Sequence, residues 1–230
     1  MWSSPEIVTV IVSADTLFCT WLVHSKKDKL SFSLRAYEAY RPDFVYTNAT
    51  SLLTTTYFIQ CMRDFLHRNS LKNPFVLLGF ASDTLYENYY WIERDSTAMN
   101  LVQQENRLLV WNYCVLDHTS ETDDTLLYVY GLSRMQIFQH QVAALTVPFN
   151  CIFMTSVKRA LLNLLWSVRS VKSSAEVVSG KTLDFSYRLT SLIEFLDYND
   201  GGLSHYSESE VEALCASMGL YLLGENYESL

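Results

Sequence analysis

The first forty residues alternate apolar and polar stretches in a pattern that predicts β-strands. Residues 6–40 contain three runs rich in β-branched and aromatic side chains, and the turn-prone segments SAD and HSKKDK separate them. This arrangement predicts an antiparallel meander. Between residues 48 and 73 the apolar positions recur at near-helical spacing, and Pro74 ends this predicted helix before the short apolar strand 75–80.

The middle of the chain predicts three more strands followed by a helix. The strands are expected at 84–93, 107–117 and 125–131. The helix follows over 133–145, and Ser133 is its predicted cap. Its apolar residues share one face, as in an amphipathic helix that packs on a core: Met135, Phe138, Val142 and Leu145.

The last third of the chain continues with strand and helix patterns. The elements are an extended segment at 147–153 and helices at 156–170, 184–198 and 207–223. Ser207 and Glu210 form the capping pair of the last helix, and the small, polar segment 171–181 predicts a linker or an exposed loop. The order of elements predicts a mixed α/β fold with antiparallel meander pieces rather than a uniformly alternating doubly wound sheet.

Composition and charge exclude several classes of function. The chain has 230 residues, of which 49% are hydrophobic and 18% charged, and this is enough apolar surface for a stable core. The formal net charge of −8 gives no diffuse positive field, so nucleic acid is not expected as a partner. Five widely spaced cysteines without CxxC spacing indicate reduced, buried thiols. No secretory signal and no apolar run of about 20 residues occurs, so we expect a cytoplasmic protein without direct membrane insertion.

Candidate catalytic and ligand-binding motifs are sparse. Gly131 stands between a strand and a helix, where a phosphate-binding turn would lie, but neither GxGxxG nor GxxxxGK[ST] occurs, and a hinge is the preferred interpretation. The five histidines show no metal-ligand spacing, and the acidic segment 117–124 around His118 is interpreted as a solvated loop tip. No GxSxG nucleophile elbow occurs. The sequence therefore predicts no catalytic residue, no metal ligand and no cofactor.

The most unusual local composition is the aromatic segment LYENYYWIE, with Trp111 and Tyr113 following it. Tyr and Trp combine large apolar faces with a polar group, so they suit a half-buried sheet face and also a surface that binds another protein. Both interpretations stay open, although the segment points toward binding rather than turnover.

Three stretches carry a resemblance to a known family. LLYVYGLSRMQIFQHQVAALTVPFNCIFMTSVKRALLNLL resembles the strand, helix, bend, strand and helix of the PilM-like proteins, the actin-fold cytoplasmic components of type IV pilus and type II secretion assemblies. In this chain AALTVP replaces the family's Ala-Gly-Leu-x-Pro. PFVLLGFASDTLYENYYWIE is similar to the strands that enter the family's small inserted subdomain, and ALCASMGLYLLGENY is similar to its terminal helix.

The resemblance implies a fold and a division into domains. It implies an α/β fold with a mixed sheet, in which an actin-like (ribonuclease H-like) first lobe occupies residues 1–170. A small inserted α+β subdomain would span about 84–146. Residues 171–230 would form a reduced second lobe, mostly helical.

The departures from the family concern nucleotide binding. Family members that bind ATP carry two Asp-x-Gly turns and a glycine pair that holds the adenosine. In this chain the first hairpin has Asp15 without a glycine, the second turn is missing, and only Gly201 and Gly202 resemble the glycine pair. The resemblance therefore predicts a degenerate nucleotide site and no enzymatic activity. The alternative is a nucleotide-binding actin-fold ATPase with diverged motifs, which would use Asp15 and the Gly201–Gly202 loop.

The resemblance also implies a role, a partner and a location. The protein would be a non-enzymatic cytoplasmic scaffold of a type IV pilus or type II secretion-like system, peripheral at the inner membrane through a protein partner. That partner would be the cytoplasmic tail of a bitopic PilN-like protein, lying in a groove between the first lobe and the inserted subdomain. The expected wall of the groove is Phe80, Leu85, Tyr86, Tyr89, Tyr90, Trp91, Trp111 and Tyr113. Formation of a homodimer stays open.

Overall fold

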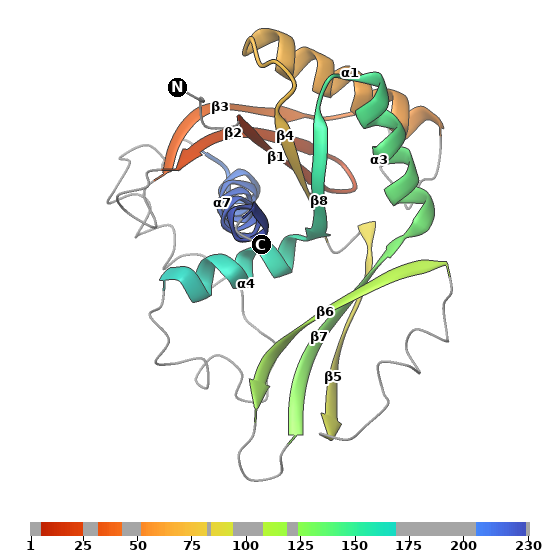
Figure 1. Cartoon of the computed structure of the whole chain (residues 1–230), viewed down its shortest axis with the longest axis vertical. Helices are drawn as coiled ribbons and strands as arrows, with labels where there is room; N and C mark the ends of the chain where they lie inside the picture. Colours follow the sequence, from red (N-terminus) through yellow and green to blue (C-terminus); the bar gives the residue numbers. More distant parts are fainter. Residues whose placement is uncertain are drawn as a thin grey trace.

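The structure is a computed structural model that describes residues 6–24, 32–42, 52–81, 84–93, 108–118, 124–168 and 206–228. In this part of the chain a sheet of five strands and a sheet of three strands combine with four helices (Figure 1). The chain therefore has the mixed α/β architecture that the strand and helix patterns predicted.

The larger sheet joins the first three strands to two later ones in the order β3-β2-β1-β4-β8. Its strands are β1 (Ile7–Val12), β2 (Leu17–His24), β3 (Phe32–Tyr40), β4 (Phe75–Phe80) and β8 (Asn150–Ser156). β1 pairs antiparallel with β2, and β2 with β3, which confirms the predicted meander. β4 runs parallel to β1 and to β8. β1 and β4 are almost continuously apolar because both of their faces are buried.

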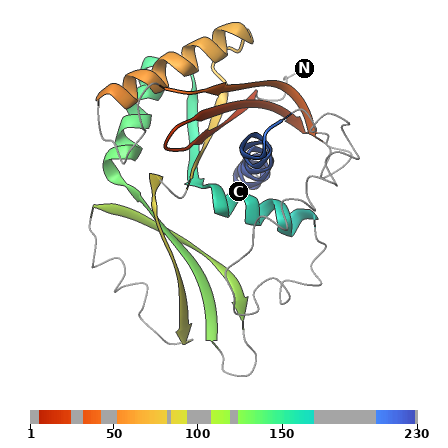
Figure 2. The same ribbon diagram turned by 180° about the vertical axis from the view of Figure 1, so that it is seen from behind.

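Helices cover both faces of the larger sheet (Figures 1 and 2). They are α1 (Leu52–Arg68), α3 (Arg134–Thr146), α4 (Val157–Val168) and α7 (Glu208–Glu228). Val8 and Val10 of β1 lie in the core that includes α1 and α3, whereas Ile7 and Ile11 lie in the core formed with α4 and α7. Alternate side chains of one strand thus belong to two separate cores.

The last helix completes the core on one face of the larger sheet. α7 packs along α4 and contacts β1, β2 and β4. Gly219 allows a close approach, because a Cβ at this position would lie 2.0 Å from the backbone oxygen of Ala160. Residues 206–228, the described part of the predicted second lobe, therefore pack on the same sheet as the first strands. Residues 171–205, with the predicted linker and the helix at 184–198, lie outside the described residues.

The smaller sheet lies within the segment 84–146 that was predicted as an inserted subdomain. Its antiparallel strands have the order β5-β7-β6. They are β5 (Tyr86–Glu93), β6 (Leu109–His118) and β7 (Asp124–Ser133). Tyr86, at the start of β5, pairs with Gly131, near the end of β7. The connections to β4 and to α3 therefore leave the smaller sheet at the same end. The rest of this sheet extends away from the larger sheet (Figure 1). α3 packs against α1 and β8 and also contacts β7.

The packing face of α3 is not the one that its apolar pattern predicted. The residues of the predicted face are largely exposed, with exposed fractions of 50% for Met135, 59% for Phe138 and 90% for Leu145. The buried residues are Gln136, His140 and Ala143. Gln136 is buried without penalty because its side chain donates to the Thr84 carbonyl and accepts from the Ser133 N–H. Ser133 caps the helix as predicted, and the capping box with Gln136 fixes which side of α3 faces inward.

Candidate functional site

A cavity of about 220 Å³ opens where the two sheets approach each other. Its walls come from β6 and β7 of the smaller sheet, from α3, and from β8 of the larger sheet. The apolar lining residues are Val110, Trp111, Leu132, Ile137, Cys151, Phe153 and Met154. The polar lining residues are Asn112, Tyr130 and Gln141. We call this cavity, with the strands that flank it, the inter-sheet groove.

Both strands that flank the inter-sheet groove are edge strands. Among the described strands, β8 pairs with β4 alone and β6 pairs with β7 alone, so each has one side without a neighbouring strand. Edge strands offer backbone N–H and C=O groups to an extended segment of another chain. The register of β8 also shifts opposite Val76 and Leu77, and bulges of this kind re-aim side chains beside binding sites.

The size and chemistry of the cavity favour apolar side chains of a larger partner. Pockets for drug-sized ligands and cofactors have volumes of roughly 300–1,000 Å³. The cavity is smaller than that range. Burial raises the pKa of the Cys151 thiol to about 11, so this cysteine is mostly protonated at neutral pH and reacts slowly. The small volume and the largely apolar lining are properties of a contact pocket.

Of the eight predicted wall residues, one lines the cavity and two pack in or against the hydrophobic cores. Trp111 contributes to the cavity lining, although its ring lies against the Tyr86 ring at 5.1 Å between centroids. Phe80 is only 1% exposed and packs in the core beside α1, so its side chain is not available to a partner. Leu85 is half-buried and packs against two cores.

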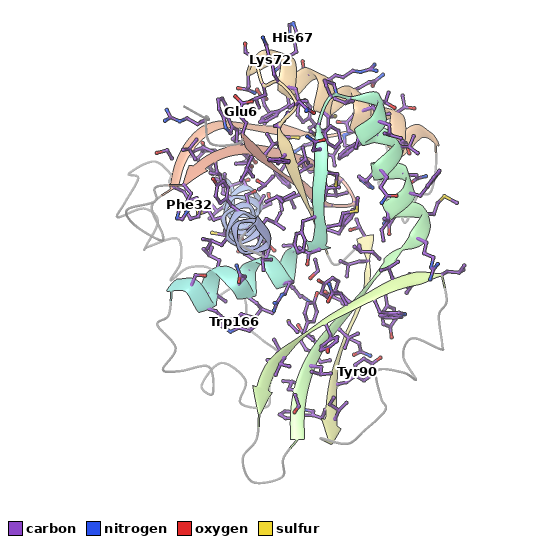
Figure 3. All side chains as sticks on the ribbon, viewed as in Figure 1. Glu6, Phe32, His67, Lys72, Tyr90 and Trp166 are labelled. Atoms are coloured by element: carbon purple, nitrogen blue, oxygen red, sulfur yellow. The ribbon has the colours of Figure 1, made fainter. Side chains whose placement is uncertain are left out.

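The other five predicted wall residues lie on two opposite faces of the smaller sheet. Tyr86, Tyr90 and Tyr113 share the face that points away from the larger sheet, as their pairing with Gly131, Leu127 and Val129 of β7 requires. Tyr89 and Trp91 lie on the other face, with Tyr128 and Leu126. Figure 3 shows Tyr90 on this sheet and Trp166 on the side of α4 that faces it. The structure thus does not bring the predicted residues together into one wall.

Sequence reasoning missed the groove residues of α3 and β8. Ile137 lies on the helix face next to the one that the apolar pattern favoured, and Phe153 and Met154 lie on a strand that was read only as extended. No local signal in 147–153 distinguishes an edge strand from a central one, because edge position depends on the order of strands in the sheet.

The turn between β1 and β2, where a phosphate would bind in an actin-fold ATPase, is closed by its own side chains. Asp15 Oδ1 accepts from the Ser13 hydroxyl at 3.1 Å and from the Thr16 hydroxyl at 3.0 Å. The Ser13 hydroxyl oxygen in turn accepts from the Thr16 N–H. None of these residues has a positive φ. Oδ1 of the exposed Asp15 is therefore engaged within the turn, and Gly201 and Gly202 lie outside the described residues.

Gly131 lies inside β7 rather than at a strand-to-helix turn. A Cβ at this position would lie 3.0 Å from the Trp111 ring, so glycine lets the indole pack flat on the strand. The strand continues to Ser133, two residues beyond the predicted end. The residue is thus a packing glycine between neighbouring strands.

His140 is the buried histidine of the described residues and packs between two aromatic rings. Its ring centroid lies 4.7 Å from that of Phe58 and 5.2 Å from that of Phe80. Nδ1 lies 2.7 Å from the Gln136 carbonyl oxygen and donates to it in the neutral ring. Burial lowers the pKa of His140, so the imidazole is an uncharged core residue.

Neither a metal-binding set of side chains nor a membrane-spanning helix occurs in the described part of the chain. Within the described ranges, no three His, Cys, Asp or Glu side chains come together as a set that could hold a metal ion. None of the described helices has both the length and the apolar character that a bilayer-crossing segment requires.

A polar cluster joins the smaller sheet to the start of α4, beside the inter-sheet groove. The Tyr128 hydroxyl donates to Glu87 Oε2 at 2.8 Å and lies 2.9 Å from the Ser156 hydroxyl. The Lys158 ammonium forms an ion pair with Glu87 Oε1. We call these four residues the inter-sheet cluster. Burial, as the largest cause, raises the pKa of Tyr128 far above its usual value, so its hydroxyl stays protonated and acts as a hydrogen-bond donor.

The two sheets and their helices define the class of fold. A five-stranded sheet with an antiparallel first half, a parallel second half and helices on both faces is an actin-like lobe of the ribonuclease H type, and the three-stranded sheet is inserted between β4 and α3. The predicted fold class, an α/β fold with a mixed sheet, is confirmed.

Comparison with solved structures gives the same fold. The chain is similar to a chain of the "PilM-PilN type IV pilus biogenesis complex", with a TM-score of 0.55 and 11% sequence identity over 71% of this chain and 51% of that one. This likeness confirms the predicted PilM-like resemblance at the level of the fold. The chain spans about half the length of that solved chain.

Two further solved structures are similar over comparable parts of the chain. One is the cytoplasmic domain of EpsL, an inner membrane component of the type II secretion system of Vibrio cholerae, with a TM-score of 0.41 and 13% identity over 67% of this chain and 57% of that one. The other is a Bacteroides thetaiotaomicron protein with an actin-like ATPase fold and unknown function, with a TM-score of 0.37 and 12% identity over 70% and 55%. No protein-family model and no curated protein matches the sequence.

Proposed function

We propose that the protein is a non-enzymatic scaffold that binds an extended segment of an inner-membrane assembly protein in the inter-sheet groove. The observation that carries this proposal is the apolar cavity between two edge strands, β6 and β8. A segment lying there would pair its backbone with an edge strand and place one or two apolar side chains in the cavity.

The chemistry of the partner follows from the fold likeness and from the groove. The similar solved structure is a PilM-PilN complex of type IV pilus biogenesis, which supports a PilN-like partner for this chain. We therefore propose the cytoplasmic tail of a bitopic PilN-like protein as the occupant, with this protein in the cytoplasm and peripheral at the inner membrane. The apolar lining favours a tail segment with large aliphatic or aromatic side chains.

The absence of enzymatic activity is part of the same proposal. In the β1–β2 turn, Asp15 Oδ1 and the Ser13 hydroxyl oxygen accept hydrogen bonds from within the turn itself. A phosphate site needs several backbone N–H groups free to converge on the anion. We therefore expect Mg-ATP to leave the melting temperature unchanged. A rise with Mg-ATP concentration would favour the alternative of a diverged ATPase.

The direct test is binding of a fluorescein-labelled peptide that comprises the cytoplasmic tail of the PilN-like protein from the same genome. Anisotropy titration is expected to give saturable binding to the wild-type chain. Ile137→Asp places a charge in the apolar lining and is expected to weaken binding by about tenfold or more, as for a buried contact residue.

The control lies on the same helix and carries the same substitution. Leu145 is 90% exposed and does not line the cavity, so Leu145→Asp is expected to leave the affinity unchanged. No binding to the wild type would overturn the proposal. Equal loss of affinity in both variants would assign the effect to α3 as a whole and would contradict the groove as the binding site.

A further inference from the structure

The smaller sheet is attached covalently to the rest of the protein at one end. The chain enters the sheet at Tyr86 and leaves it at Ser133, and Tyr86 pairs with Gly131 two residues before that exit. The opposite ends of the strands, at Glu93 and Asp124, point away from the larger sheet (Figure 1). Noncovalent contacts must therefore set the angle between the two sheets.

Among the described residues, those contacts come from α4, from α3 and from the end of β8, where the Thr155 hydroxyl hydrogen-bonds to Tyr130. Leu162 and Trp166 of α4 give an apolar contact with the inner face of the smaller sheet. The inter-sheet cluster adds polar contacts, whose geometry depends on the angle between the sheets. Lys158 contacts one carboxylate oxygen of Glu87, and the Tyr128 hydroxyl donates to the other. The Glu87 and Lys158 side chains are only 17% and 26% exposed, so the pair is little screened by solvent.

The position of Lys158 in its helix has an electrostatic explanation that involves Glu87. Lys158 lies in the first turn of α4, where the positive end of the helix dipole disfavours a cation. The first turn contains no acidic residue, and the Ser156 hydroxyl accepts from the Arg159 N–H as an N-cap does. The negative charge that this helix end attracts is thus supplied from the other sheet, by Glu87.

The inter-sheet cluster is directly connected to a wall of the inter-sheet groove. Tyr130 lines the cavity, pairs with Glu87 across the strands, and stacks on Tyr128 with 5.5 Å between ring centroids. The cavity has β6 and β7 on one side and α3 and β8 on the other. A change in the angle between the sheets therefore changes the width of the groove.

We propose that Glu87 and Lys158 are positioning residues that hold the smaller sheet at the angle required for partner binding, through their ion pair and the Tyr128 hydroxyl. Without the ion pair, the sheet turns about its attached end and the groove opens. The effect on partner affinity rests on the proposed function, whereas the effect on the groove itself does not.

Cys151 provides a readout of the groove that needs no partner. It lines the cavity and is half-buried, whereas the other four cysteines are buried. Glu87→Gln and Lys158→Met each remove the ion pair with little change in side-chain size. Both variants are expected to raise the rate of Cys151 alkylation by iodoacetamide, measured by mass spectrometry, by about fivefold. The charge-swapped double variant, Glu87→Lys with Lys158→Glu, is expected to return the rate toward that of the wild type.

Three outcomes separate a positioning role from general loss of stability. An equal rise in alkylation of all five cysteines would indicate global unfolding and would overturn the proposal, as would an unchanged Cys151 rate in both single variants. Asp64→Asn removes the exposed ion pair with Arg68 on α1 and is expected to leave the Cys151 rate unchanged. A raised rate confined to Cys151, with no peptide binding by the wild type, would support the positioning role and contradict the proposed function.

Discussion

The Tyr130 hydroxyl and the Thr155 hydroxyl lie 2.7 Å apart, and this hydrogen bond joins the middle strand of the smaller sheet to the end of β8. Both residues are buried, with exposed fractions of 2% and 0%. A polar contact at this depth costs stability when one partner is removed, because the other hydroxyl is left without its neighbour.

A double-mutant cycle measures that contact. Tyr130→Phe and Thr155→Val are each expected to lower the free energy of unfolding by about 1–2 kcal/mol, and the double variant by about 1 kcal/mol less than the sum. Urea unfolding followed by circular dichroism gives the values. Tyr113→Phe, at a residue that is 50% exposed, is the control and should have little effect. Strict additivity would show that the two hydroxyls do not interact.

Gly219 is expected to be the least tolerant glycine of α7. A Cβ there would lie 2.0 Å from the Ala160 carbonyl oxygen, which is backbone and cannot move aside without shifting α4. Gly219→Ala should therefore cost about 3 kcal/mol or more, despite the better helix propensity of alanine. At Gly224 the nearest atom is the end of the Leu77 side chain, so Gly224→Ala is expected to cost much less in the same urea titration.

His140 should make stability depend on pH in the acidic range. Burial lowers the pKa of His140 in the folded state, so the unfolded state binds the proton more tightly. The stability that neutral His140 contributes is complete above the unfolded pKa of about 6.5. As pH falls below that value, the free energy of unfolding decreases by up to about 1.4 kcal/mol per pH unit. His140→Gln is expected to flatten this slope, whereas His67→Gln, at an exposed position of α1, should keep it. Equal slopes for the wild type and His140→Gln would contradict the assignment.

The Cys151 thiol should react like a thiol of high pKa. Burial raises the pKa of Cys151 to about 11, so its alkylation rate is expected to keep rising about tenfold per pH unit from pH 8 to 10. In urea the same thiol should level off above about pH 9, near the ordinary thiol pKa. A plateau near pH 9 in the folded protein would show that the cavity is more hydrated than its lining indicates.

Ser133 is expected to stabilise α3 through its capping box. Its hydroxyl accepts from the Met135 N–H at 3.2 Å, and the Gln136 side chain accepts from the Ser133 N–H. Ser133→Ala should lower the free energy of unfolding by about 1 kcal/mol. Ser133→Asp retains an acceptor at the cap and is the matched control, with a smaller loss in the same measurement.

The pattern of apolar positions predicted most strands and helices of the described residues, and the reason is local. β1 and β4 are short apolar runs bounded by turn residues, and α7 begins at the Ser207–Glu210 pair, whose hydrogen bonds are present in the structure. Each of these signals depends on residues close in the chain. The packing face of α3 was predicted incorrectly because it buries Gln136, whose side chain bonds to the Thr84 carbonyl 52 positions away, a contact that the apolar pattern does not contain.

The inter-sheet groove could not be predicted from the sequence for a similar reason. Its lining combines β6, α3 and β8, which become neighbours only through the order of strands in two sheets. The side chains of the aromatic segment 85–93 lie on both faces of the smaller sheet, because successive residues of a strand point in opposite directions. The unusual composition lies on β5 and β6 of the smaller sheet, but it does not identify which surface lines the groove.

The hydrogen bond between Ser217 and Thr20 links positions 197 residues apart, so it can form only late in synthesis of the chain. At a synthesis rate of 5–20 residues per second, about 10–40 s pass between the appearance of β2 and that of its α7 neighbour. During that interval α7 does not yet cover this apolar face of the nascent sheet. Ribosome-bound chains of this protein should therefore depend on a chaperone that shields this face until α7 has been synthesised.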